Sequence, residues 1–436
     1  MSEVAYGKRD LPAIKRKFRI YLLYAGTRII ANKFIGRSVN SILVYPAIDD
    51  KNKLADYLNR LAWGFPSKEN LSIFVTVSED LKDINLKSLS APPNQRCYLN
   101  SLNKVVLIDE YEAREKFDSG IILVTKTKAF RDPAIFLKLH KTMIVDPYCF
   151  SFEEANIWKD GYYKTFDKKE IEQFKSISKR NLSSLLKQNK YKDKACCFAT
   201  GPSFDRYKEF DYGDDCFKVI CNSTVKNDAF LEYANGPDLL VFADPVFHFS
   251  PCEYSAQFRD NVLDVVRKYG CFVMVPDMTM PLLLAHYPEL KSKLIGMPSG
   301  RSLNIPSIDK FYVKKSSNIL TFLMLPLASA IAKKVFIIGA DGREPNEKYF
   351  WKHSSSVQYD DLMKTAFETH PSFFRDRDYK DYYENHCKYL EKLISYGESR
   401  GIQYYSLTPS YIPALKNRQI ETLMRSDNDA EGKIKK

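Results

Sequence analysis

The stretch KACCFATGPSF, residues 194–204, decides the fold of this chain. Its apolar run stops at Thr200, and Gly201, Pro202 and Ser203 follow at once. A short apolar run that ends in turn residues is typical of a strand buried on both faces of a parallel sheet. Glycine lacks the Cβ that would keep a ligand from the backbone, and such a turn can present N–H groups. We therefore predict a buried strand whose carboxyl end can hold a ligand.

Similar apolar runs occur along most of the chain in two series. The first series lies within residues 40–146, and the second begins at residue 195. Helix-length segments separate the later runs, around 255–269, 319–333 and 379–400. This alternation predicts an α/β protein with two Rossmann-like lobes, each built on a mainly parallel sheet. The runs are SILVYPAI, LSIFVTVSED, KVVLIDEY, GIILVTKT and KTMIVDPY, then ACCFA, FKVIC, DLLVFA, CFVMV, VFIIG and IQYYS.

Polar segments between the runs set the expected domain boundaries. We predict an N-terminal lobe over residues 1–165, a basic linker over 166–194 and a second lobe over 195–415. Residues 416–436 are polar and are expected to form a tail. A chain of 436 residues is long enough for two domains of ordinary size.

The cysteines and the apolar runs bear on the compartment. The nine cysteines form no CxxC pair, and several lie inside apolar runs, which is typical of reduced thiols in a cytoplasmic protein. No apolar run approaches the ~20 residues that cross a bilayer, and the first residues do not follow a signal-peptide pattern. We therefore expect a cytoplasmic protein.

The net charge of +12 raises the question of a polyanionic partner. Basic residues are concentrated at 8–19 and 187–194, where a solvated surface and an anionic membrane or glycan are both open interpretations. Residues 18–36 contain both apolar and basic side chains, so we expect them to form either a core element or a surface that contacts the inner membrane. No zinc finger, helix-turn-helix or RNA-binding signature is present, so nucleic acid is not an expected partner.

Small or hydrogen-bonding residues follow several strands of the second series. Besides Thr200–Ser203, they are 222–224 (Asn-Ser-Thr), Asp244, 340–343 (Ala-Asp-Gly-Arg) and Ser410. Each is an ordinary turn by itself, but ligands of open α/β sheets bind beyond the carboxyl ends of the strands. The set therefore predicts a nucleotide site. Neither GxGxxG nor a Walker sequence is present, which disfavours a dinucleotide cofactor and a P-loop ATPase.

As an ordered series, these motifs resemble the bacterial family 42 sialyltransferases. The matching pieces are TGPS (200–203), ICNS (220–223) and the helix and strand NILTFLMLPLASAIAKKVFIIGAD (318–341). The resemblance implies a CMP-sugar donor whose nucleotide contacts Thr200, Gly201, Pro202 and Ser203, together with Asn222 and Ser223. It also implies phosphate contacts from Tyr349 and from Arg343, which stands where the family has a second tyrosine. The two lobes suggest a GT-B-like glycosyltransferase with a central cleft.

Asp244 departs from that family, which has an amide before the proline of FADP (242–245). A carboxylate there can act as a nucleophile and form a glycosyl-enzyme intermediate. This resembles the retaining β-Kdo transferases, which are two-lobed and also use a CMP-sugar. The alternative is an aspartate that only caps a turn.

His370 is the expected general acid or base, because it lies roughly where the sialyltransferases have their catalytic histidine and imidazole titrates near neutral pH. Alternatively, it packs under Phe373 and Phe374. His353 is near enough to Tyr349 to reach the phosphate, or it is structural.

Three other features bear on the site. Ser316, Ser317 and Asn318 can bind the sugar carboxylate at a helix N-terminus or simply cap that helix. Glu153 or Glu154 can face the cleft as a second carboxylate. The DxD sequence at 376–378 lies in a charged loop, so we expect no essential metal and no cofactor.

The leading hypothesis is a transferase that moves Kdo from CMP to a glycan or lipid-linked glycan at the cytoplasmic face of the inner membrane. One alternative is an inverting sialyltransferase with His370 as base. A second is a pterin diphosphokinase-like enzyme that uses ATP and magnesium, and a third is a nucleotide-binding module without activity.

Overall fold

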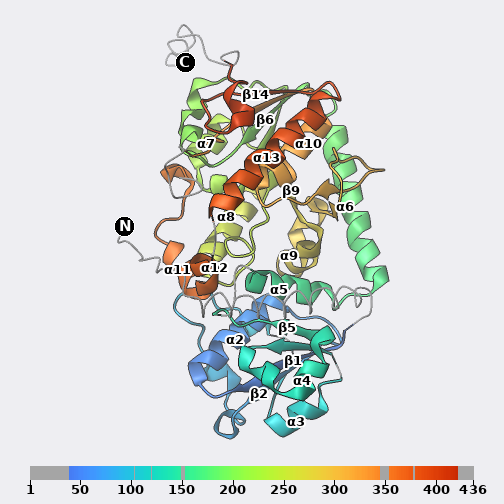
Figure 1. Cartoon of the computed structure of the whole chain (residues 1–436), viewed down its shortest axis with the longest axis vertical. Helices are drawn as coiled ribbons and strands as arrows, with labels where there is room; N and C mark the ends of the chain where they lie inside the picture. The colour runs from blue at the N-terminus through green and yellow to red at the C-terminus, as the bar shows by residue number, and fades with distance from the viewer. Residues whose placement is uncertain are drawn as a thin grey trace.

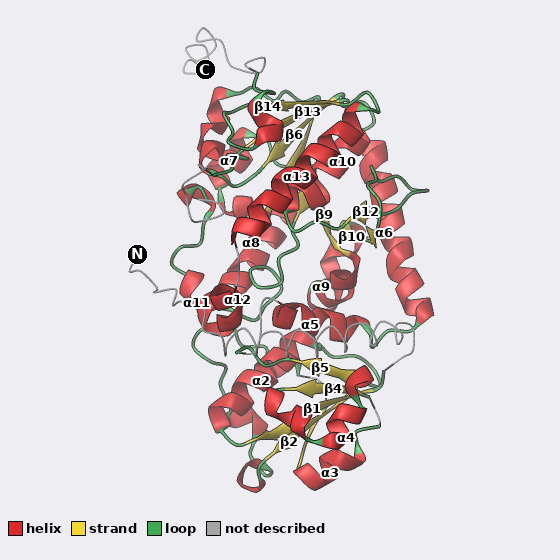
Figure 2. Cartoon of the chain, viewed as in Figure 1, coloured by secondary structure: helices red, strands yellow, loops and turns green. Residues whose placement is uncertain are grey.

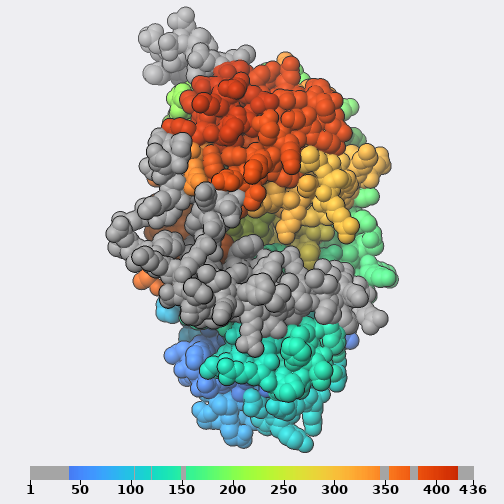
Figure 3. Space-filling model, viewed as in Figure 1, coloured from blue at the N-terminus to red at the C-terminus, as the bar shows by residue number. Residues whose placement is uncertain are grey.

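The computed structural model of this chain describes residues 39–102, 104–118, 120–148, 153–343, 353–376 and 379–420. It has two mainly parallel sheets flanked by helices, one in each of two lobes, so the predicted fold class is confirmed (Figure 1). The lower lobe in this view is N-terminal, and the upper lobe is C-terminal. Figure 3 shows the N-terminal lobe in blue to cyan below the orange and red surface of the C-terminal lobe.

The N-terminal lobe contains a five-stranded sheet in the order β3-β2-β1-β4-β5, in which every neighbouring pair is parallel. The strands are β1 Ser41–Ile48, β2 Ser72–Val77, β3 Val105–Ile108, β4 Ile121–Val124 and β5 Thr142–Ile144. The helices are α2 Lys51–Gly64, α3 Glu110–Glu115, α4 Pro133–Leu137 and α5 Glu153–Tyr163. Short 3-10 turns are η2 Glu79–Leu81, η3 Leu86–Ser88, η4 Leu99–Ser101, η5 Thr127–Arg131 and η6 Leu139–Lys141.

The C-terminal lobe contains a seven-stranded parallel sheet in the order β10-β9-β8-β7-β6-β13-β14. The strands are β6 Lys194–Phe198, β7 Cys216–Cys221, β8 Leu239–Val241, β9 Phe272–Pro276, β10 Leu294–Met297, β13 Lys334–Ile338 and β14 Gln403–Ser406; β11 Ser299–Gly300 pairs with β12 Val313–Lys314. The α-helices are α6 Lys168–Gln188, α7 Asp228–Tyr233, α8 Glu253–Tyr269, α9 Met280–His286, α10 Leu325–Ile331, α11 Met363–Thr369, α12 Pro371–Asp376, α13 Tyr379–Glu398 and α14 Pro413–Lys416. Shorter elements are η7 Pro202–Glu209, η8 Asn222–Lys226, η9 Asp277–Thr279, η10 Pro288–Ser292 and η12 Ser355–Val357, with a π-helical turn, η11, over Leu320–Met324.

Burial on both faces of the larger sheet explains its apolar strands. In β6, Cys196 and Phe198 pack into the core on one face, whereas Ala195 and Cys197 pack into the core on the other. Every residue of β7 is likewise buried, including the aliphatic part of a lysine. Helices therefore cover both faces, as the near-continuous apolar runs predicted.

The segment 166–194, which we expected to be a linker, differs from that expectation. Most of it forms the 21-residue helix α6, which flanks the larger sheet (Figure 2). Asp167 and Glu170 form a capping box at its start, and its buried face includes Leu182 and Leu185. The segment is polar on average because only one face of the helix is buried. The sequence analysis also did not include β10, which is short and contains a glycine.

The two lobes pack tightly where we expected a central cleft. Trp63 of α2 is 1% exposed, and its indole N–H donates to the carbonyl of Phe249 in the other lobe at 2.8 Å. The Trp63 ring stacks on His286 and lies 3.8 Å from the guanidinium carbon of Arg259. Arg259 in turn donates to the Tyr98 hydroxyl of the N-terminal lobe. Buried side chains therefore fill this part of the boundary.

His286 at this contact makes the stability of the chain pH-dependent. Burial, together with the nearby Arg259, lowers the pKa of His286 to about 4. The unfolded chain, with a histidine pKa near 6.5, therefore binds the proton first, and stability present above pH 6.5 is lost as the pH falls toward 4. When the pH falls from 7 to 5, we expect the free energy of unfolding of the wild type to decrease by about 2 kcal/mol more than that of His286→Gln, which has no imidazole to protonate. Urea unfolding at both pH values measures this, and equal pH slopes would contradict it.

No helix in the described part of the chain is long and apolar enough to cross a membrane. The segments 8–19 and 18–36, which we considered for contact with a membrane surface, lie outside the described residues, as does most of the expected tail at 416–436.

Candidate functional site

The carboxyl ends of β6, β7 and β8 lie side by side in the larger sheet. Phe198 pairs with Ile220, Cys221 pairs with Val241, and Ile338 of β13 pairs with Phe198. The turns that follow these strands therefore meet at one edge. Strand order reverses between β6 and β13, and such a switch point is where ligands of open α/β sheets bind.

The turn after β6 is closed by another part of the same lobe. The Gly201 N–H donates to the carbonyl of Gly339 at 2.8 Å, and the Ser203 N–H donates to Asp341 Oδ2 at 3.2 Å. A Cβ at Gly201 would lie 2.1 Å from Asp341 Oδ2. Glycine is needed here because Gly339 and Asp341 approach the backbone, which replaces our interpretation that it admits a ligand. Pro202 occupies the first turn of η7, where no N–H is required.

Hydroxyl groups of the same turn bond to two other segments. Thr200 Oγ1 lies 2.9 Å from His353 Nδ1, and Ser203 Oγ lies 2.8 Å from Thr408 Oγ1. The pKa of His353 is lowered by burial, which favours a neutral ring. His353 thus contacts Thr200 directly at the edge, and its contact with a phosphate stays a prediction.

Asn222 follows β7 in a left-handed conformation, with φ of 49°. Its Oδ1 atom is buried and has no hydrogen-bond partner among the described residues. The neighbouring Thr224 is fully buried, and its Oγ1 is likewise unpartnered within that part of the chain. Ser223 bonds to the Tyr254 hydroxyl. An unpaired buried acceptor is costly, and Asn222 as a residue is only half-buried, unlike Ser250, so its amide is suited to a ligand that donates a hydrogen bond.

Asp244 follows β8 and caps a turn. Its Oδ1 accepts the N–H groups of Val246 at 2.8 Å and Phe247 at 3.1 Å. The Asp244 N–H donates to His248 Nδ1 at 3.0 Å, and burial lowers the pKa of His248 to about 3, so this ring is neutral. Asp244 therefore caps this turn, as the alternative interpretation proposed. The same hydrogen bonds hold its half-buried carboxylate at the sheet edge.

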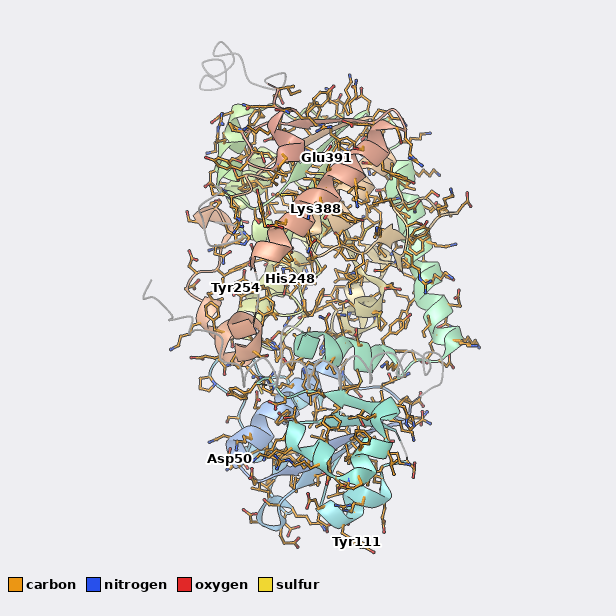
Figure 4. The ribbon with its side chains drawn as sticks, viewed as in Figure 1. Asp50, Tyr111, His248, Tyr254, Lys388 and Glu391 are labelled. Atoms are coloured by element: carbon orange, nitrogen blue, oxygen red, sulfur yellow. The ribbon has the colours of Figure 1, made fainter. Side chains whose placement is uncertain are left out.

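Two residues near Asp244 were not singled out for a role at the site. Tyr254 at the start of α8 bonds to Ser223 and is close enough to Asp244 to feel its charge, and burial raises its pKa. His248 orients the Asp244 turn by accepting the N–H of Asp244. Figure 4 labels both residues, which lie at the level between the larger sheet and the N-terminal lobe.

His370 lies in a closed network at the lobe boundary. Its Nε2 is 2.8 Å from Ser250 Oγ, and its Nδ1 is 2.7 Å from Glu154 Oε2. Ser250 and His370 are 2% exposed and Glu154 is 4% exposed. A serine, a histidine and a carboxylate in this order resemble a nucleophilic triad, but burial withholds the serine from any substrate. Both ring nitrogens already have partners, and the ring is buried, so the structure gives no support to the prediction of His370 as general acid or base.

Arg60 of α2 completes this network. It is 3% exposed, and its Nε lies 2.9 Å from Asp56 Oδ2. Its other nitrogens lie 3.5 Å from Glu154 Oε1 and 2.9 Å from the carbonyl of Thr369. Burial opposes ionisation of Glu154, but His370 and Arg60 outweigh it and lower the pKa of this carboxyl. Glu154, which we considered as a cleft carboxylate, therefore binds both lobes together.

Ser316 and Asn318 cap the helical segment before β13. Asn318 Oδ1 accepts the Leu320 N–H at 2.9 Å, and Ser316 Oγ lies 2.8 Å from Thr321 Oγ1. The carbonyl of Ser317 accepts a hydrogen bond from the Tyr382 hydroxyl. These contacts support the capping interpretation and leave sugar binding by the three residues as a prediction.

Of the remaining predicted residues, Arg343 contacts an aromatic ring, and the others lie wholly or partly outside the described residues. The guanidinium of Arg343 lies 4.9 Å from the centre of the Tyr383 ring. Tyr349 and most of the DxD sequence are outside the described residues, as is the side chain of Glu153. In the described ranges, no three His, Cys, Asp or Glu side chains are grouped as metal ligands.

Comparisons of this chain with protein-family models, with curated proteins and with solved structures found no match.

Proposed function

We propose that this chain is a glycosyltransferase that moves a 2-keto acid sugar, with Kdo favoured, from its CMP donor to a surface polysaccharide or lipopolysaccharide of a bacterium. The observation that carries the proposal is Asn222 at the switch edge of the larger sheet, whose buried Oδ1 has no hydrogen-bond partner among the described residues. The amino group of cytosine is a donor that fits such an acceptor. Thr200, Ser223 and His353 border the same edge.

Asp244 is the proposed nucleophile. Its carboxylate attacks the anomeric carbon, and the bond from that carbon to the phosphate oxygen breaks, so CMP leaves with the electron pair. The acceptor hydroxyl then attacks the same carbon, loses its proton to a base and releases the Asp244 carboxylate. Two inversions give net retention of configuration.

The burial of His370 argues against the inverting alternative in which His370 is the base. An inverting enzyme needs a base that reaches the acceptor hydroxyl, whereas His370 is buried with partners on both nitrogens. Asp244 is half-buried at the sheet edge. We therefore assign His370 to positioning the loop after α11.

The acceptor side and the place of action follow from the proposal. We propose that the N-terminal lobe binds the glycan or lipid-linked acceptor. Sugar transfer is proposed to take place at the cytoplasmic face of the inner membrane. Neither a metal nor a cofactor is part of the proposed reaction.

Calorimetry of the full chain tests the proposed nucleotide. We expect CMP to bind the wild type, and we expect Asn222→Ala to weaken this binding about tenfold or more, because a buried hydrogen bond is lost. Asn235→Ala is the matched control, because Asn235 also has positive φ, 52°, but follows α7 at the amino edge of the sheet. Tight binding of ATP with magnesium and no response to CMP would overturn the proposal in favour of the diphosphokinase-like alternative.

A further inference from the structure

The first βα turn of the C-terminal lobe already holds an anion from the chain itself. In open α/β sheets, the turn at the switch point and the helix that follows it commonly hold the phosphates of a nucleotide. Here the carboxylate of Asp341 occupies that turn, with Oδ2 accepting the Ser203 N–H at 3.2 Å. The same oxygen fills the space beside Gly201, where a Cβ would come within 2.1 Å of it.

The backbone fixes Asp341 in this place. Gly339 and Gly342 on either side have φ of 75° and 76°, a conformation that other residues rarely adopt. The carbonyl of Asp341 accepts the Tyr411 N–H at 2.7 Å, and a Cβ at Gly339 would lie 2.2 Å from the carbonyl of Ala199. The carboxylate is therefore built into the turn.

Among the described residues, no direct ion pair neutralises this carboxylate. The charge of Arg206 in η7 acts on it, but that guanidinium is paired with Glu209 by hydrogen bonds of 2.5 to 3.0 Å. Burial also raises the pKa of Asp341, as expected for a carboxyl withdrawn from water. A second anion at this turn would face repulsion at short range and would need the space that Asp341 fills.

We propose that Asp341 determines nucleotide specificity by excluding nucleoside diphosphates and triphosphates from the switch-point turn. A nucleotide with one phosphate can place its base near Asn222 and keep its phosphate away from the turn. A longer phosphate chain reaches the turn and meets the carboxylate. This inference rests on the proposed nucleotide site. It would explain why the proposed donor carries one phosphate, although α/β folds of this kind often bind nucleotides with two phosphates.

Calorimetry with CMP and CDP on the full chain tests the proposal. We expect CDP to bind the wild type at least about tenfold more weakly than CMP, and Asp341→Ala to abolish this preference. Asp341→Asn keeps an acceptor for the Ser203 N–H without the charge, so it tests repulsion if the alanine variant does not fold. Asp214→Asn is the matched control, because it removes a charge from an exposed position in the same lobe. Equal affinity of the wild type for both nucleotides, or an unchanged preference in both Asp341 variants, would overturn the proposal.

Inorganic pyrophosphate separates this proposal from the proposed function. If neither CMP nor CDP binds the wild type, the proposed function fails, and pyrophosphate decides the role of Asp341. We then expect pyrophosphate to bind the folded Asp341 variant at least about tenfold more tightly than the wild type or Asp214→Asn. No gain in pyrophosphate affinity would refute the exclusion by Asp341.

Discussion

Asp244→Asn is expected to abolish sugar transfer, with a loss of about 10³-fold or more, because an amide cannot form the glycosyl ester. The fold should survive, since asparagine still offers an oxygen to the N–H groups of Val246 and Phe247. CMP binding should survive too, because Asn222 belongs to a different strand end. The measurement is CMP release from CMP-Kdo by the full chain.

A covalent adduct provides the more specific readout for this prediction. In the absence of an acceptor, the wild type should release one equivalent of CMP and gain the mass of one sugar on the peptide that contains Asp244. Asp211→Asn is the matched control, because Asp211 also caps a turn, by accepting the Gly213 N–H, but is exposed. Normal turnover by Asp244→Asn, or an adduct on that variant, would disprove the nucleophile assignment.

The strands were predictable because their burial is encoded locally. Runs such as FKVIC are apolar except for one lysine, and β7 is indeed buried on both faces. Helix α6 was missed because its average composition is polar, although DKKE at 167–170 is a capping-box sequence and Leu182 and Leu185 lie on its buried face. Attention to periodicity rather than composition would have identified this helix.

The contacts between distant segments were beyond sequence reasoning. His370 and Glu154 are 216 residues apart, and their bond depends on how α5 and the loop after α11 pack together. The contact between Gly201 and Asp341 depends on the pairing of β6 with β13. The sequence motifs predicted which strand ends meet, but not which side chains satisfy one another there.

Arg60→Met is expected to lower the free energy of unfolding by about 3–5 kcal/mol, because it removes the cation of a buried ion pair and leaves the carboxylates behind. Asp56 and Glu154 would lose their cation, and the carbonyl of Thr369 would lose its donor. Urea unfolding followed by tryptophan fluorescence suits this test, because Trp63 and Trp158 both lie at the boundary. Trp158 donates to Glu154 Oε1 itself at 2.8 Å.

Arg206→Met is the matched control for burial. Arg206 forms close hydrogen bonds with Glu209, but both side chains are about 40% exposed. Its loss should cost only about 0–1 kcal/mol, because water screens and replaces the exposed pair. A cost for Arg60→Met as small as that for Arg206→Met would contradict a structural role of the network.

The double variant Arg60→Met/Glu154→Gln distinguishes the strength of the pair from the cost of an unpaired charge. Much of the loss in Arg60→Met is expected to come from leaving Glu154 ionised and buried without Arg60. Removing the second charge should therefore restore part of the stability, and the two single losses should not add. Urea unfolding of the wild type, both single variants and the double variant at pH 8, where ordinary carboxyl groups are ionised, measures the cycle. Additive losses at that pH would mean that Arg60 and Glu154 act independently, with Asp56 as the partner that holds Arg60 at the boundary.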